Sequence, residues 1–270
     1  MLSQLRVPWA FIVRDFRVDV SYKLGFIFRV ISAILTVAIY YFIANVFGDT
    51  AAPYLKAYGG SYFAFVVIGV AFTDYMVIGT NAIGESIRDG QTTGTLELML
   101  LSPTRLAVTL LSTSLWSYVF ATLRIAVYLV VGTALGMSLG NANIPVALVA
   151  LVLAMISFSA LGLFTASVII LMKRGDPLGW GLRISSVILS GVYYPVGVLP
   201  GWLRLVGQAL PLTHALELLR RSLLLGEGFS QLAGEFLTLA ALALALFVFG
   251  LLACQIAIQI ARTDGSLSHY

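Results

Sequence analysis

The fold of this chain is decided by the stretch Ile144–Met172, which reads IPVALVALVLAMISFSALGLFTASVIILM. It contains no charged residue, and it is longer than the roughly 20 apolar residues that a helix needs to cross a bilayer. The stretch therefore predicts a membrane-spanning helix, with spare length for tilt or for projection beyond the lipid.

The composition of the whole chain agrees with this prediction. Of its 270 residues, 60% are hydrophobic and only 10% are charged. Soluble domains usually carry about 25% charged residues, so this chain cannot cover a large core with a water-facing surface. The composition excludes an ordinary soluble protein and indicates an all-α integral membrane protein.

Five further stretches have the length and apolar character of a span. Together with the first stretch they predict six transmembrane helices, at residues 24–47, 61–83, 106–139, 144–172, 179–198 and 231–260. We find no internal repeat of 20–50 residues and no low-complexity linker. We therefore expect residues 1–270 to form a single transmembrane domain.

The lysine and arginine residues predict the orientation of these spans. With the N-terminus inside, most of these residues fall in cytoplasmic segments, whereas the opposite side holds only Lys56, Arg204, Arg220 and Arg221. Positive charge is enriched in cytoplasmic loops. Both termini, and the polar segment 84–105 between the second and third spans, are therefore expected in the cytoplasm.

Residues 1–23 form a separate amphipathic segment. Its apolar residues recur every three or four positions, and its charged residues fall off that stripe. The stripe comprises Leu5, Trp9, Ile12, Val13, Phe16 and Val20, and the charged residues are Arg6, Arg14, Asp15 and Arg17. This pattern predicts a helix lying in the membrane interface; the alternative is a first turn of the following span.

The segment 195–230 is apolar but cannot form one continuous helix. Pro195, Pro200 and Pro211 each lack an amide hydrogen and would clash with the preceding helical turn. We expect two short re-entrant helices, at about 201–209 and 213–225, that dip into the outer leaflet. Broken backbone at membrane depth is tolerated where protein or a water-filled cavity covers it, so Tyr193, Tyr194, Pro195 and Pro200 are candidates for a translocation path.

Two of these segments resemble the ABC-2 type transporter permeases. The first carries Glu85 and then Gly94-Thr95-Leu96-Glu97 and Leu100-Leu101-Ser102-Pro103. The second runs from Gly191 through Pro195, Leu199-Pro200-Gly201-Trp202-Leu203 and Leu210-Pro211-Leu212-Thr213 to Glu217 and Arg220. The order of spans and the N-terminal helix are similar as well. The stretch Asp89–Thr93 departs from the family pattern and leaves the start of the cytoplasmic helix open.

The resemblance implies a permease half of an ABC exporter in a bacterial or archaeal cytoplasmic membrane, surrounded by membrane lipids. A second copy of the chain and two separate ATPase subunits would complete it. A cytoplasmic coupling helix would sit in a groove of the ATPase. The residues implied in this coupling are Glu85, Arg88, Gly94, Thr95, Leu96, Glu97, Leu100, Ser102 and Pro103.

Two charged residues within spans are further candidates. Asp74 and Arg124 each cost roughly 2.5–3.5 kcal/mol to insert at a helix centre. They either line a polar path or satisfy each other as a structural pair, although the expected span ends place their depths roughly 10 Å apart. Arg220 and Arg221 with Glu217 either form a surface pair or face lipid headgroups, and His214 is expected to be a polar residue at a helix start.

The chain lacks a G-x-x-x-x-G-K-[ST] phosphate loop, so it is not expected to hydrolyse ATP. We therefore expect a non-catalytic subunit without a cofactor or metal of its own, with ATP and Mg in the partner ATPase and no nucleic-acid partner. The expected cargo is amphiphilic: a lipid-linked glycan, a lipid or a hydrophobic drug-like compound. Two alternatives remain open, a proton- or ion-coupled carrier that uses Asp74 and a non-transporting scaffold that recruits an ATPase.

Overall fold

The computed structural model describes residues 2–92, 106–172 and 176–263, and all regular structure in these ranges is helical. This confirms the predicted all-α class. The elements are α1 (Leu2–Ser21), α2 (Lys23–Ala51), η1 (Ala52–Tyr58), α3 (Tyr62–Thr92), α5 (Leu106–Ala134), α6 (Ile144–Met172), α7 (Pro177–Leu189), η2 (Val196–Val198), α8 (Gly201–Gln208), α9 (Pro211–Arg220), η3 (Arg221–Leu225) and α10 (Phe229–Thr263).

In the described part of the chain, five helices are long and apolar enough to cross a membrane: α2, α3, α5, α6 and α10. They cover five of the six predicted spans. The sixth, predicted at residues 179–198, coincides with α7 only as far as Leu189, because α7 has 13 residues; its predicted end is therefore too late, and its crossing of the membrane stays a prediction. The length of α7, about 20 Å, is less than the roughly 30 Å of a hydrocarbon core. The helix ends where Gly191 adopts a positive φ of 75°, and Pro195 then holds the chain extended.

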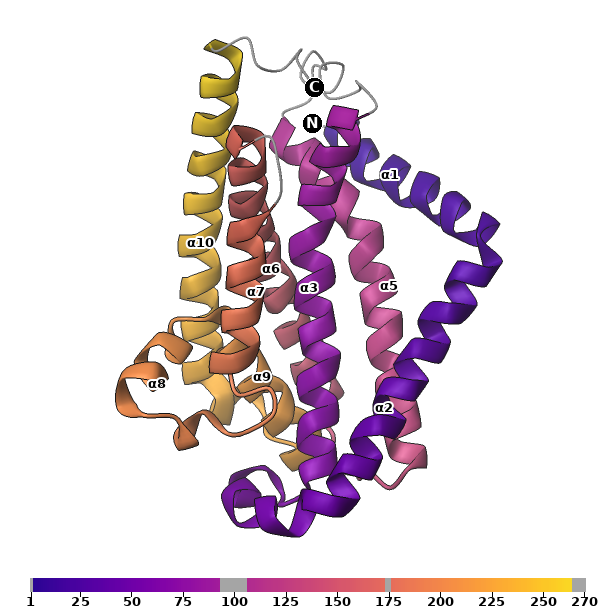
Figure 1. The fold of residues 1–270 in the computed structure, drawn as a ribbon, viewed down its shortest axis with the longest axis vertical. Coiled ribbons are helices and arrows are strands. Elements are labelled where there is room, and N and C mark those ends of the chain that lie inside the picture. Colours follow the sequence, from indigo (N-terminus) through magenta and orange to yellow (C-terminus); the bar gives the residue numbers. More distant parts are fainter. Residues whose placement is uncertain (1, 93–105, 173–175, 264–270) are drawn as a thin grey trace.

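The N-terminal amphipathic segment forms a helix of its own. α1 has 20 residues and is separated from α2 by Tyr22, whose backbone is not helical. Figure 1 shows α1 slanting away from the bundle, at the same end as the last turns of α10. Trp9 and Phe16 on its apolar stripe are exposed. The helix is thus confirmed, and its place in the membrane interface stays a prediction.

Helix α3 lies at the centre of the bundle with α5 and α6 against it (Figure 1). The three helices meet closely at Gly79 and Gly162. A Cβ atom on Gly79 would lie 2.2 Å from Tyr118 Oη, and one on Gly162 would lie 3.2 Å from the Gly79 carbonyl oxygen. Tyr118 Oη donates a hydrogen bond to the Met155 carbonyl and accepts one from Ser159 Oγ. Small residues at such crossings let the backbones of two helices approach each other closely.

The two short helices expected in segment 195–230 are present. α8 covers Gly201–Gln208, and α9 with η3 covers residues 211–225, each within two residues of the expected bounds. η3 ends at Gly226, whose φ of 72° suits the left-handed turn there. Figure 1 places both helices away from the end that carries α1. Their depth in a bilayer stays a prediction.

The contact at Gly79 predicts a specific loss of stability. Gly79→Ala should lower the melting temperature of the purified chain in detergent, because overpacking costs about 1–3 kcal/mol and the added methyl meets Tyr118. Gly181→Ala in α7 is the matched control, since a Cβ there has no neighbour within 4 Å. Thermal unfolding followed by circular dichroism measures both, and equal melting temperatures for the two variants would contradict the packing.

Candidate functional site

The helix that leads into the segment predicted to be cytoplasmic is longer than its predicted span. The span was predicted to end at Ile83, but α3 continues through Asp89 to Thr92 and has 31 residues. At about 46 Å it is longer than a hydrocarbon core, so its last turns can project beyond the lipid. Asp89–Thr92, which departs from the family pattern, is thus helix.

These last turns of α3 have two distinct faces. Ile83 and Ile87 are fully buried in an apolar cluster with residues of α6 and α10, such as Leu163. Glu85 and Arg88 lie on the exposed face, three residues apart. The packing of one face therefore holds the two charged side chains outward, where a partner can reach them.

The other predicted coupling residues are Gly94, Thr95, Leu96, Glu97, Leu100, Ser102 and Pro103, which lie outside the described residues. The coupling helix itself therefore stays a prediction. The structure places only Glu85 and Arg88 of this set.

Asp74 and Arg124 form an ion pair, with 3.0 Å between Arg124 Nη2 and Asp74 Oδ2. Tyr128 Oη donates to the same carboxylate oxygen, and Arg124 Nη2 also donates to Ser32 Oγ at 3.2 Å. The cluster joins α2, α3 and α5. The expected difference of depth between Asp74 and Arg124 was wrong because α3 ends later than predicted. Asp74 lies 18 residues before the end of α3 at Thr92, and Arg124 lies 18 residues after the start of α5 at Leu106.

Arg124 also lines a polar cavity of about 270 Å³ between α2, α3 and α5. Other polar groups in its wall are Arg29, Asn81, Glu85 and Ser117. The two interpretations of Arg124 are therefore compatible, since its guanidinium is paired and still borders a cavity. This cavity reaches toward the end of α3 that exposes Glu85.

The remaining path candidates lie elsewhere. Tyr193 stacks on Tyr40 with 6.0 Å between ring centroids, and Tyr194 Oη donates to the Ile188 carbonyl. Pro195 and Pro200 precede η2 and α8. The structure does not bring these four residues together with Asp74 and Arg124, so the predicted set divides into two groups.

Among the described residues, the most deeply buried charged side chain is that of Arg220 in α9, which is only 3% exposed. Its Nε and Nη2 donate to the Phe65 carbonyl at 3.2 and 3.1 Å. Nη1 donates to the Gly191 carbonyl at 2.8 Å, and Nη2 donates to the Val192 carbonyl at 2.9 Å. The guanidinium carbon lies 3.4 Å from the Phe65 ring centroid. We refer to Arg220 and these three carbonyl groups as the Arg220 cluster.

The expectation of a surface or headgroup-facing Arg220 is therefore wrong. Its neighbour Arg221 does form the expected pair with Glu217, at 3.9 Å, and a closer one with Glu227 at 2.6 Å. Glu217 also accepts a hydrogen bond from Tyr58 Oη at 2.7 Å. Adjacent residues on a helix point in directions about 100° apart, which places one arginine inside and one outside.

Two glycines make room for the Arg220 cluster. A Cβ atom on Gly69 would lie 2.4 Å from the Val192 carbonyl oxygen and 2.7 Å from Arg220 Nη2. Gly191 turns the chain with its positive φ, which brings its own carbonyl onto Arg220. The resemblance pointed to Gly191 and Arg220, but Gly69 and Phe65 carry no signal in the sequence that links them to Arg220.

His214 lies in the first turn of α9, as expected, and joins three helices. Its Nδ1 is 2.7 Å from Glu235 Oε2 in α10, and its Nε2 is 2.8 Å from the Gln208 carbonyl oxygen of α8. Within the described residues no group of three or more His, Cys, Asp or Glu side chains could hold a metal ion. His214 thus serves as a hydrogen-bonded link between helices.

The exposed end of α3 and the broken segment that contains the buried Arg220 both fall in one region of similarity. The family model described as ABC-2 type transporter matches residues 9–224. The chain belongs to the ABC-2 type transporter family. A comparison with curated proteins gave no match.

Membership of the ABC-2 type transporter family identifies the chain as a multi-pass membrane protein and a permease subunit of an ABC transporter. Such permeases are transport components that are generally non-catalytic, and the family implies an ABC ATPase as partner. The matched region contains the Arg220 cluster and ends before α10.

The Asp74–Arg124 pair predicts non-additive effects of substitution. Asp74→Asn and Arg124→Gln should each lower the melting temperature, because each leaves one charge unpaired within a span. The double variant should lose less stability than the two single variants lose together, and the difference should be about 1–3 kcal/mol. Denaturation of the four proteins in detergent measures this cycle, and additive losses would show that the pair contributes nothing.

Proposed function

We propose that the chain is the permease subunit of an ATP-driven exporter in which α3 transmits movement from the ATPase to the outer side of the membrane. The observation that carries this proposal is the continuity of α3. One helix holds both the exposed Glu85 and Arg88 and, through its Phe65 carbonyl, the Arg220 cluster.

The geometry of α3 supports a mechanical role. Phe65 and Arg88 are separated by about 35 Å along a single helix. A helix of this kind, packed on several sides, moves as a rigid body and not by bending. A displacement of the Arg88 end therefore displaces the Phe65 end, and the Arg220 cluster carries α9 along with it.

The energy for this movement has to come from another chain. The sequence has no phosphate loop, so ATP and Mg would be bound and used by the partner ATPase. We propose two ATPase subunits and two copies of the permease around a central path. The end of the bundle that carries α1 and the end of α10 would face the cytoplasm of a bacterial or archaeal cell.

An amphiphilic cargo suits the walls of the proposed path. The cavity beside Arg124 contains charged and amide groups within a bundle whose outer faces are apolar. Such a cavity can shelter a polar headgroup while an apolar tail stays in the lipid. A lipid, a lipid-linked glycan or a hydrophobic drug-like compound meets this description.

The exposed charges at the end of α3 provide the test. In proteoliposomes that hold the permease with its ATPase, Arg88→Glu should lower permease-stimulated ATP hydrolysis about tenfold, because reversing a charge at an interface disturbs its electrostatic complementarity and weakens binding. The melting temperature should not change, since Arg88 is exposed. Lys56→Glu, at an exposed site in η1, is the control and should leave hydrolysis unchanged.

Unchanged stimulation of the ATPase by the Arg88→Glu permease would contradict contact at this face. Loss of stimulation in both variants would also contradict it, because the effect would then follow net charge and not position.

A further inference from the structure

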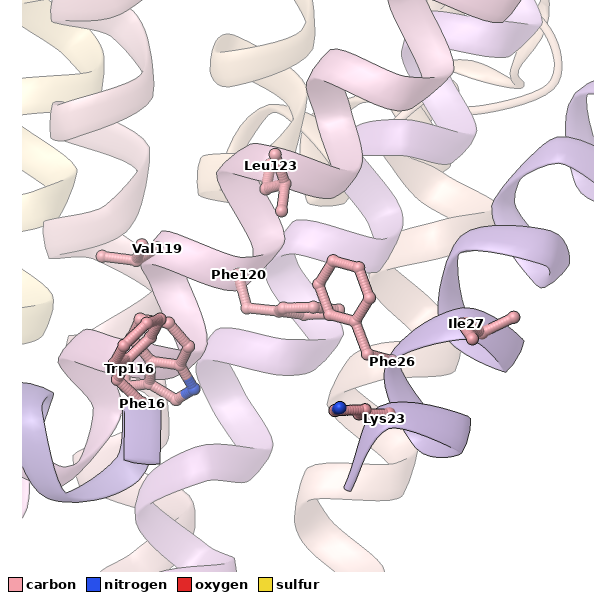
Figure 2. A pocket seen from close by; sticks show the side chains of 8 residues that line it. All are labelled: Phe16, Lys23, Phe26, Ile27, Trp116, Val119, Phe120 and Leu123. Carbon is pink, nitrogen blue, oxygen red and sulfur yellow. The ribbon is translucent and has the colours of Figure 1, made fainter. Parts of the chain in front are cut away.

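A second cavity, apolar and of about 620 Å³, lies between α1, α2 and α5. Its volume is within the usual range of ligand pockets, roughly 300–1,000 Å³. Seven of its lining residues are apolar or aromatic: Phe16, Phe26, Ile27, Trp116, Val119, Phe120 and Leu123. The remaining one is Lys23, and Figure 2 shows its side chain extending from the start of α2 toward the Phe16–Trp116 side.

The cavity walls are set by ring contacts between the three helices. The Phe16 ring of α1 meets the Trp116 ring edge-on at 5.3 Å, and the Phe26 ring of α2 meets Phe120 at 5.8 Å. From Trp116 to Leu123 the wall runs about 10 Å along α5. The cavity is thus an elongated apolar slot, held open by rings from three different elements (Figure 2).

Lys23 lines the slot with the apolar stem of its side chain and adds a positive charge beside it. It is the first residue of α2, and the apolar run of the span begins directly after it. Lys23 is exposed, and among the side chains that the structure describes no carboxylate lies within 4.0 Å of its ammonium group. A lysine in this position places its charge at the boundary between hydrocarbon and headgroups, where phosphate is the abundant counter-ion.

A molecule that occupies the slot has to fit both its apolar wall and the positive charge of Lys23. A protein helix packed over the slot would bury the Lys23 ammonium against apolar side chains, which is costly without a counter-ion. A lipid acyl chain fits the slot, and a phosphate at its head meets the lysine. The mouth of the slot is also lined by exposed apolar side chains such as Val119 and Leu123, as a site open to lipid requires.

We propose that this cavity binds an acyl chain of an anionic membrane phospholipid whose phosphate pairs with Lys23. The bound chain fills the space between α1, α2 and α5, and so couples the N-terminal helix to the bundle. This cavity adjoins the polar cavity beside Arg124, with Trp116 and Phe120 in the walls of both, and the proposal requires only that the chain lies in a membrane.

Trp116 in the wall of the cavity provides a direct reporter. In a variant whose other tryptophans, Trp9, Trp180 and Trp202, are replaced by Phe, phospholipids brominated on their acyl chains will quench Trp116 on contact. Nanodiscs are titrated with brominated phosphatidylglycerol or with brominated phosphatidylcholine. The anionic lipid should bind about fivefold more tightly, the effect of one lysine at a membrane surface.

Lys23→Gln in this background should remove the preference for phosphatidylglycerol while Trp116 is still quenched. Lys56→Gln, which removes an exposed lysine in η1, should keep the preference and serves as the control. Val119→Phe, which narrows the slot, should reduce quenching by both lipids.

Three outcomes would overturn the proposal. Equal affinity of the parent for both lipids, or an unchanged preference in Lys23→Gln, would show that Lys23 does not hold a phosphate. Absence of quenching by either lipid would show that protein, such as a second copy of the chain, covers the cavity.

Discussion

The structure depends on the hydrogen bonds of one buried cation, the guanidinium of Arg220. A guanidinium removed from water is costly unless its donors are satisfied, and here the carbonyls of Phe65, Gly191 and Val192 accept from it. Hydrogen bonds to charged groups are worth about 1.5–3 kcal/mol each. Because its acceptors belong to α3 and to the turn after α7, Arg220 fixes the broken segment 195–230 to the central helix. The cluster thus holds α9 to α3, and His214 links α8 to α9 and α10.

The same helix connects the two ends of the permease. At one end α3 is fixed by Arg220, in its middle by the Asp74–Arg124 pair and the close contact at Gly79, and at the other by Ile83 and Ile87. In the described part of the chain, the face of its last turns that holds Glu85 and Arg88 is exposed and open to a partner. A helix held in this way has little freedom to bend, which makes it suited to transmitting a displacement across the membrane.

The sequence predicted those features that depend on local composition. Apolar length located five long spans and most of α7, proline positions located α8 and α9, and amphipathic spacing located α1. It failed where contacts between distant residues decide the structure. Arg220 meets Phe65 from 155 residues away, and nothing in either segment indicates that meeting. The end of α7 was predicted too late because the turn at Gly191 interrupts an apolar run that still has the composition of a span.

The most direct test of transmission through α3 is the amount of cargo exported per ATP hydrolysed by an Arg220→Lys permease. Lysine keeps the charge, but its single nitrogen cannot reproduce the geometry in which guanidinium nitrogens bond to carbonyls of two segments. In proteoliposomes the account predicts that permease-stimulated ATP hydrolysis stays near normal while export per ATP falls at least tenfold. An unchanged ratio of export to hydrolysis would contradict it.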